Sequence, residues 1–383
     1  MDYYCSSKFT DLQVHVQGKL LYNCCNALPE RIDLDWLESN PGKLFHTNTM
    51  IDDRKLMLDN KSCESCHFGC YRYEEKGLSS KRLEIRNHKH IDDPMAPLKN
   101  LSISLATDCN LTCMYCDPEF SSSWYRDIEK NGEHKLDGIT IKNDNWSKLW
   151  SKMKQNLRSD ETRFFNLLVN EIAMADHIEE LSFLGGEPLL HNGLEKIVDS
   201  LDNKKITIVS GLGVSDSRLI NFLKKFRDRK ITFVVSGEST GKFFELLRFG
   251  ISWKEFQDRI KVIEDHGFEI ELTSAMSNIS TLDFINFFET FQDRYFIRTN
   301  SLTQRPFLMP HVLDDDSKEV FMRHADLYPN VRQIQELKKS IEMTPSGTDR
   351  SNLGRYLKEF SARRSIDLEF LPKSFRDWVG IDR

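Results

Sequence analysis

The feature that most constrains the fold is an alternation of short apolar runs with longer amphipathic segments from Leu101 onward. This alternation is typical of βα units and a parallel sheet. Six repeats are fewer than the eight of a closed barrel, so we expect a partial or open α/β barrel. The predicted strands are Leu101–Ala106, Glu180–Leu184, Lys205–Ser210, Ile231–Ser236, Phe268–Thr273 and Arg294–Thr299.

Helical periodicity fills the gaps between these strands. Asp216 and Ser280 are predicted to cap two of the helices. Functional residues of such folds lie at the carboxyl ends of the strands, so the residues directly after each strand are the candidates for a site. The predicted helices are Gly193–Leu201, Ser217–Arg227, Phe243–Asp265 and Thr281–Phe291, and two more in the tail, Val331–Ile341 and Gly354–Arg364.

The first hundred residues differ from the rest. We predict a hairpin around Gly18 and a linker at Asp93–Pro97. All nine cysteines of the 383 residues lie at or before position 116. The chain begins without an export signal and has no run of 18 apolar residues, so we expect a cytoplasmic protein without a membrane span. Clustered cysteines in that compartment are typical of metal ligands rather than disulfides. The net charge of −6 gives no general attraction to nucleic acid.

Three cysteines form a C-x3-C-x2-C motif directly after the first predicted strand. A loop of this length can bring three thiolates to one face of an iron–sulfur cluster and leave the fourth iron open to a ligand. The alternative is a structural zinc site, which usually takes four ligands. The three residues are Cys109, Cys113 and Cys116.

A second motif, Gly185-Gly186-Glu187-Pro188, ends the second predicted strand. Glycines allow the backbone to approach a ligand closely, and a carboxylate beside them can accept hydrogen bonds from an ammonium group. The alternative is an ordinary strand-to-helix turn.

Together, these two motifs resemble the radical S-adenosylmethionine superfamily over about residues 98 to 300. The resemblance implies a partial (β/α)6 barrel, a 4Fe–4S cluster and bound S-adenosylmethionine. A low-potential donor such as flavodoxin or ferredoxin would supply the electron for reductive cleavage. The resulting 5'-deoxyadenosyl radical would abstract hydrogen from a substrate, which the sequence leaves open among peptide, sugar and nucleotide.

The resemblance also implies roles for particular residues. Cys109, Cys113 and Cys116 would bind the cluster. At the segment expected to contact the ribose, this chain has Val209-Ser210-Gly211, where the superfamily often has Thr-Asn-Gly. The remaining contacts would be Tyr115 near the adenine, Gly185, Gly186 and Glu187 at the methionyl part, and Ser210 and Ser236 at the ribose or carboxylate.

The amino-terminal region is similar to a twitch domain, a shortened relative of the SPASM domain, placed before the barrel. The resemblance implies an auxiliary 4Fe–4S cluster, with zinc as the alternative metal, and a carboxylate or substrate contact for Arg248. A surface salt bridge is the alternative role for that arginine. The group's C-x2-C pair, aligned through Cys70, would place a ligand at His67. Our first choice of ligands is therefore Cys5, Cys24, Cys66 and Cys70, with Cys63 or Cys25 as replacements.

The expected layout has three parts. Residues 1–95 form the small iron–sulfur domain, residues 96–300 form the barrel, and residues 301–383 form a helical extension. The competing class of protein is a zinc-stapled binding protein on a degenerate barrel.

Overall fold

The computed structural model describes residues 2–24, 26–75, 80–85, 90–143, 158–201, 204–302 and 305–382. Cys25 lies outside the described residues, as do residues 76–79. The chain divides into two compact units. Unit 1 comprises residues 1–107, 149–208 and 228–231, and unit 2 comprises residues 108–148, 209–227 and 232–383.

The strands predicted from the alternating pattern are present. Their inward side chains are buried, as in β4, where Leu101 and Ile103 are buried between partly exposed neighbours. The pattern therefore identified the interior positions as well as the strands. The strands are β4 (Asn100–Ser104), β8 (Glu180–Leu184), β9 (Lys205–Ser210), β10 (Ile231–Ser236), β12 (Glu269–Met276) and β13 (Phe296–Ser301).

These strands are hydrogen-bonded in the order β13-β12-β10-β9-β8-β4-β1-β2-β3. The pairs β12/β13, β10/β12, β8/β9 and β4/β8 are parallel. The amino-terminal hairpin is confirmed, because β1 (Asp11–His15) and β2 (Leu20–Tyr22) pair antiparallel around a turn at Val16–Gly18. Since β1 also pairs in parallel with β4, this hairpin extends the sheet. The short strand β3 (Glu30–Arg31) pairs with β2.

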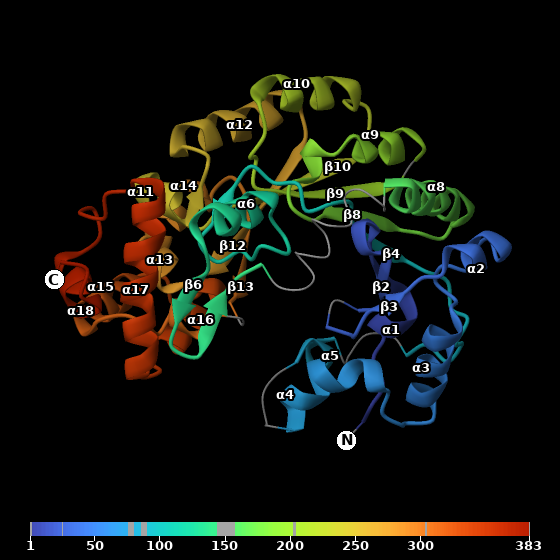
Figure 1. Cartoon of the computed structure of the whole chain (residues 1–383), viewed down its shortest axis with the longest axis horizontal. Coiled ribbons are helices and arrows are strands. Elements are labelled where there is room, and N and C mark those ends of the chain that lie inside the picture. The colour runs from blue at the N-terminus through green and yellow to red at the C-terminus, as the bar shows by residue number, and fades with distance from the viewer. Residues whose placement is uncertain are drawn as a thin grey trace. The chain divides into compact units, whose positions relative to one another are not determined.

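Unit 1 surrounds its strands with short helices (Figure 1). Cysteines lie in the turns between them, a 3-10 turn at Glu64–Cys66 and a kinked π-helical turn at His67–Tyr71. Phe9, Met57 and Tyr71 form a small apolar core with Cys5, Cys63 and Cys66. The helices are α1 (Ser7–Thr10), α2 (Leu34–Ser39), α3 (Asn48–Leu58), α4 (Arg72–Glu75), α5 (Lys81–Glu84), α8 (Arg158–Met174) and α9 (Asn192–Asp199).

Unit 2 differs from the predicted helix pattern in two places. The predicted helix 243–265 is two helices, α11 (Gly241–Leu247) and α12 (Trp253–Asp265), separated by the short strand β11 (Arg248–Phe249). The predicted helix Thr281–Phe291 begins later, as α14 (Phe284–Phe291), and Thr281 instead ends a separate short helix, α13 (Asn278–Thr281). Periodicity alone missed these breaks because apolar residues continue through them.

Both predicted caps were also wrong. Ser215, rather than Asp216, caps α10 (Asp216–Lys225), because the Ser215 hydroxyl accepts the Arg218 N–H. Ser277, rather than Ser280, caps α13 through a capping box.

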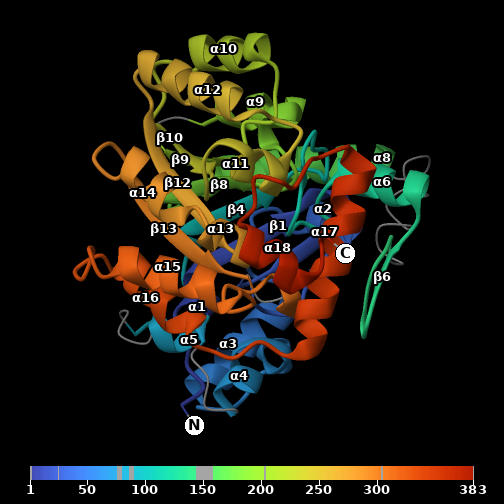
Figure 2. The same cartoon turned by 90° about the vertical axis from the view of Figure 1, so that its left-hand side faces the viewer.

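Figures 1 and 2 both place α10 and α12 side by side on one face of the strands.

The last two helices of unit 2, α17 and α18, share a core with the segment that follows Cys113. Leu353, Tyr356 and Phe360 of α17 belong to the same buried cluster as Met114 and Trp124. The tail is therefore packed against the cysteine loop of its own unit.

None of the described helices is long and apolar enough to cross a membrane. The helices are α6 (Ser122–Asn131), α15 (Asp315–Ala325), α16 (Arg332–Ile341), α17 (Gly347–Arg364) and α18 (Lys373–Val379); the short strands β6 (His134–Leu136) and β7 (Ile139–Ile141) form a hairpin.

Candidate metal centres

The cysteine loop of unit 2 is fixed by a short strand pair. Strand β5 (Thr112–Cys113) pairs antiparallel with β11, and this register places Arg248 opposite Cys113. The Met114 N–H donates to the carbonyl of Leu247 over 2.8 Å and continues the pairing. The break between α11 and α12 therefore provides the backbone partner of the second cysteine.

The start of α6 holds the other side of the loop. The Trp124 Nε1–H donates to the Cys113 carbonyl over 2.8 Å, and the Ser123 hydroxyl donates to the Cys109 carbonyl over 2.7 Å. The Leu111 N–H points to Cys109 Sγ at 3.4 Å, a contact that favours a thiolate. The loop backbone is thus held at two of its three cysteines.

Two glycines allow other segments to approach this loop closely. Gly250 has φ +117°, and a Cβ there would lie 2.8 Å from the Asn110 carbonyl oxygen. A Cβ at Gly213 would lie 2.7 Å from Leu111 Cγ, and Asn110 Nδ2 donates to the Gly213 carbonyl over 3.0 Å. A larger residue at either position would displace the loop.

The three thiols of the loop lie within electrostatic reach of one another. Loss of hydration raises the pKa of Cys116 well above its usual value, and the neighbouring Cys113 and Cys109 raise it further. Thiolates that repel one another in this way are stabilised by a shared cationic centre. All three are free thiols. Within the described part of the chain, no three Cys, His, Asp or Glu side chains are grouped as ligands of a single metal ion.

Arg248 lies in a buried ion pair beside Cys113. Its Nη2 and Nε donate to Glu238 Oε2 over 2.8 and 3.2 Å, and its Nη1 lies 4.0 Å from Cys113 Sγ. Glu238 is fully buried, and its other oxygen accepts the Tyr115 hydroxyl over 2.9 Å. The surface salt bridge weighed for Arg248 is therefore wrong, as is its predicted place within a helix.

Glu238 was missed in the sequence. The available signal was its position two residues after β10, at the carboxyl end of a predicted strand. The resemblance instead predicted a ligand contact for Ser236, the last residue of that strand.

Two residues of the carboxyl-terminal region bind the backbone of the cysteine loop. Arg305 donates to the carbonyls of Met114 and Cys116, each over 2.5 Å, and to Asp117 Oδ1 over 2.6 Å. The Tyr356 hydroxyl donates to the same Met114 carbonyl over 2.5 Å. Both side chains are buried. Sequence reasoning missed them because they lie about two hundred residues from the loop.

The Gly-Gly-Glu-Pro motif of unit 1 has internal partners. Gly185 has φ +123°, and a Cβ there would lie 2.7 Å from the Ala106 carbonyl oxygen, which also accepts the Gly186 N–H over 3.0 Å. Glu187 is buried and accepts the Leu189 N–H over 3.3 Å, capping a short turn. The glycines therefore serve the close approach of two strand ends, and Glu187 is fixed directly after them.

The two predicted serine contacts end neighbouring strands of unit 2. Ser210 is buried at the end of β9, and its hydroxyl accepts the Leu212 N–H over 2.9 Å. Ser236 is partly exposed at the end of β10. Their contacts with a ligand stay predictions.

Four amino-terminal cysteines interact within unit 1. A shared hydrogen bond with Cys66 lowers the pKa of Cys63 to about 6, and the same bond raises that of Cys66. Burial raises the pKa of the Cys5 thiol, and the charge of Cys70 adds to this shift. Negative charge on one thiol is thus felt by the others, as expected for a set of metal-binding thiols.

The approach of Cys70 depends on a glycine. A Cβ at Gly69 would lie 2.2 Å from the Asn26 carbonyl oxygen, and Asn26 Nδ2 lies 3.9 Å from Cys70 Sγ. Cys24 is also buried in this unit, two residues before Asn26. His67, where alignment through Cys70 would place a ligand, is exposed.

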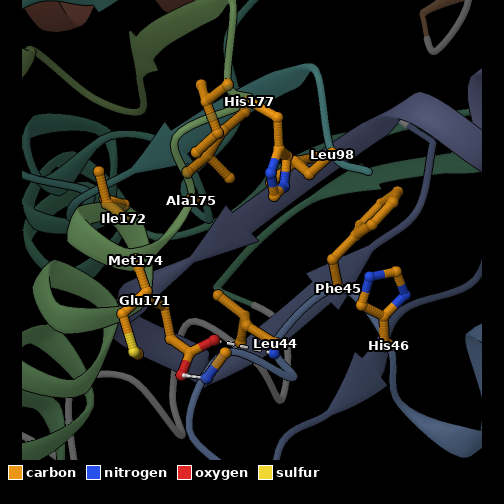
Figure 3. A pocket seen from close by; sticks show the side chains of 12 residues that line it. Leu44, Phe45, His46, Leu98, Glu171, Ile172, Met174, Ala175 and His177 are labelled. Atoms are coloured by element: carbon orange, nitrogen blue, oxygen red, sulfur yellow. Dashed lines mark hydrogen bonds between the residues drawn. The ribbon is translucent and has the colours of Figure 1, made fainter. Parts of the chain in front are cut away.

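Unit 1 also has a small pocket, and none of these cysteines lines it (Figure 3). Its walls are mostly apolar, and His46 and His177 are at its edge. The Glu171 carboxylate accepts the N–H groups of Gly42 and Leu44 over 2.7 and 3.0 Å. That carboxylate stabilises a turn of its own chain.

Neither a family model nor a curated protein matches this sequence. Among solved structures, the chain is similar to native anSMEcpe with bound AdoMet, with 14% identity and a TM-score of 0.36. That alignment covers 61% of this chain and 60% of the anSMEcpe chain.

It is also similar to Streptococcus suis SuiB. The structure bound to the precursor peptide SuiA gives 14% identity and a TM-score of 0.35 over 86% of this chain and 70% of SuiB. The structure bound to S-adenosylmethionine gives 12% identity and a TM-score of 0.34 over 85% and 68%. S-adenosylmethionine, the ligand expected from the resemblance of the two sequence motifs, is bound in the first anSMEcpe structure and in the second SuiB structure.

Proposed function

We propose that this protein is a radical S-adenosylmethionine enzyme. Cys109, Cys113 and Cys116 would hold a 4Fe–4S cluster, which supplies the electron for reductive cleavage of S-adenosylmethionine to methionine and a 5'-deoxyadenosyl radical. The observation that carries the proposal is the cysteine loop itself. Its three thiols lie within electrostatic reach of one another, its backbone is fixed on several sides, and a buried arginine lies beside its middle cysteine.

The residues around the loop have separable tasks. The three thiolates hold iron, because thiolates are the usual ligands of such clusters. The Arg248 guanidinium compensates negative charge beside Cys113, and Glu238 fixes the orientation of that guanidinium through two hydrogen bonds. Glu238 also orients the Tyr115 hydroxyl, which keeps the aromatic ring next to the cluster cysteines, where an adenine can pack.

The remaining contacts would bind the rest of S-adenosylmethionine. Glu187 would accept hydrogen bonds from the methionyl ammonium, a charge-assisted contact. Gly185 and Gly186 would keep the backbone beside it close to the ligand. Ser210 and Ser236 would contact the ribose or the carboxylate from the ends of β9 and β10.

We also propose an auxiliary cluster on Cys5, Cys63, Cys66 and Cys70. The mutual interactions of these thiols support Cys63, one of the replacements named from the sequence, as the fourth ligand, and Cys24, also buried in unit 1, is the alternative. Four thiolates would leave no open iron, which suits a cluster that transfers electrons rather than one that binds a ligand.

The substrate that loses hydrogen would be a peptide, a sugar or a nucleotide. The SuiB structure with its precursor peptide favours a peptide among these. A flavodoxin or ferredoxin would be the electron donor, and the cytoplasm its compartment.

Iron content and product formation test the proposal together. Anaerobically purified protein should be brown and carry about eight irons per chain, the number for two four-iron clusters. With dithionite it should convert S-adenosylmethionine to 5'-deoxyadenosine. A colourless protein that contains only zinc and leaves S-adenosylmethionine intact would favour the zinc-stapled binding protein instead.

A further inference from the structure

A fully buried lysine lies beside the amino-terminal cysteine set, with its backbone N–H bonded to the Cys5 carbonyl. Lys8 has no exposed surface. Its Nζ donates to Asn23 Oδ1, Asp53 Oδ2 and Ser65 Oγ over 2.5, 2.8 and 2.5 Å. These three bonds use all the protons of the ammonium group. Any effect of Lys8 on the thiols therefore acts through its charge and not through a direct N–H···S bond.

The thiols lie within range of that charge. The Lys8 ammonium forms an ion pair with Asp53 Oδ2 over 2.8 Å. The Ser65 hydroxyl links the pair to the cysteines, since its oxygen lies 2.5 Å from Asp53 Oδ2 and 3.6 Å from Cys63 Sγ. A buried charge pair is thus held against two proposed cluster ligands.

A buried ion pair is a costly way to stabilise a fold, because desolvation of two charges offsets much of their attraction. Apolar side chains of similar volume would fill the same space next to Phe9 and Met57. The position of the pair beside Cys63 and Cys66 gives it an electrostatic task that apolar residues could not perform.

We propose that the Lys8–Asp53 pair sets the reduction potential of the auxiliary cluster, an inference that rests on the proposed function. Reduction adds one electron from a low-potential donor, and no bond is made or broken. The ammonium of Lys8 stabilises the added negative charge and raises the potential, while the Asp53 carboxylate lowers it. Lys8 and Asp53 are positioning residues that act on the cluster through space.

The two charges have opposite signs, which makes the test sharp. The background is the variant with Cys109, Cys113 and Cys116 replaced by alanine, so that only the auxiliary cluster remains. Lys8→Met, Asp53→Asn and the double variant are compared in that background. Each midpoint potential is measured by redox titration with mediators and electron paramagnetic resonance detection.

Lys8→Met should shift the potential to more negative values, Asp53→Asn should shift it to more positive values, and the double variant should return close to the parent. A purely structural role would move both single variants in the same direction or leave both unchanged. Either of those results, with about four irons retained, overturns the inference but leaves the auxiliary cluster in place.

Two further outcomes are decisive. Absence of iron from the triple-alanine parent itself would overturn the proposed auxiliary cluster and this inference with it. If Lys8→Met does not fold, Asp53→Asn decides alone, because a positive shift supports the inference and any other result rejects it.

Discussion

The two cysteine regions of this protein are held in place by different kinds of interaction. In unit 2, the loop from Cys109 to Cys116 is held by its backbone, through the β5/β11 pair, the start of α6 and the contacts of Arg305 and Tyr356. In unit 1, the cysteines lie in short turns around a buried charge network. A fixed backbone suits a site that must keep one iron open in a defined geometry. A closed four-thiolate site can be organised by its own metal.

The largest expected effect separates the two regions by function. Cys113→Ala should abolish cleavage of S-adenosylmethionine and leave about four of eight irons, because two thiolates cannot hold the open cluster. The fold should survive, since the strand pair depends on the backbone of Cys113. Iron analysis and detection of 5'-deoxyadenosine check both statements. Cleavage at the native rate would refute the assignment of this loop.

The choice of ligands in unit 1 gives the next largest effect. Cys63→Ala should remove the auxiliary cluster, about half of the iron, and lower the thermal stability of unit 1, because the thiolates also cross-link its turns. Cys24→Ala is the matched control and should retain about eight irons. The reverse pattern in iron content would restore Cys24 to the ligand set.

The backbone contacts of the unit 2 loop are tested through Arg305. Arg305→Met removes a buried cation that binds two carbonyls and Asp117, so it should destabilise unit 2 by about 3 kcal/mol. Loss of iron to a chelator from the unit 2 cluster should become faster. The exposed Arg332, which pairs with Glu336 on the same helix, supplies the control Arg332→Met, for which no change is expected. Equal rates for the two variants would argue against a positioning role.

Glu187 distinguishes ligand binding from local stability. Glu187→Ala and Glu187→Gln should both weaken binding of S-adenosylmethionine by about 1.5 to 3 kcal/mol, the range for a hydrogen bond to a charged group. Only the alanine variant should also lose the cap on the turn at Leu189, at about 1 kcal/mol. Anaerobic calorimetry and thermal unfolding measure the two effects. Native affinity in Glu187→Gln would assign the ammonium contact to another residue.

The smallest expected effect comes from one hydroxyl group. Tyr356→Phe keeps the ring in the core but removes the hydrogen bond to the Met114 carbonyl, at about 1 kcal/mol. Chelator-driven loss of iron should be faster than in the native protein and slower than in Arg305→Met. A loss as fast as that of Arg305→Met would show that the hydroxyl, and not the guanidinium, dominates the support of the loop.

Local patterns in the sequence determined much of this protein. The short apolar runs identified the strands β4, β8, β9, β10, β12 and β13, because each of these strands buries apolar side chains in the sheet. The hairpin at Gly18 followed from its own turn. The cysteine motif likewise predicts three ligands from a local pattern, because all three cysteines lie within eight residues.

Only the tertiary structure decided which distant residues support these sites. Arg305 and Tyr356 bind the Met114 carbonyl from 191 and 242 residues away, and Lys8 binds Asp53 and Ser65 from 45 and 57 residues away. A single lysine or arginine has no periodicity, so nothing in the sequence distinguishes a buried one from a solvated one. Burial turns such a residue into an interaction with the loop or the thiols, and burial is a property of the packed chain.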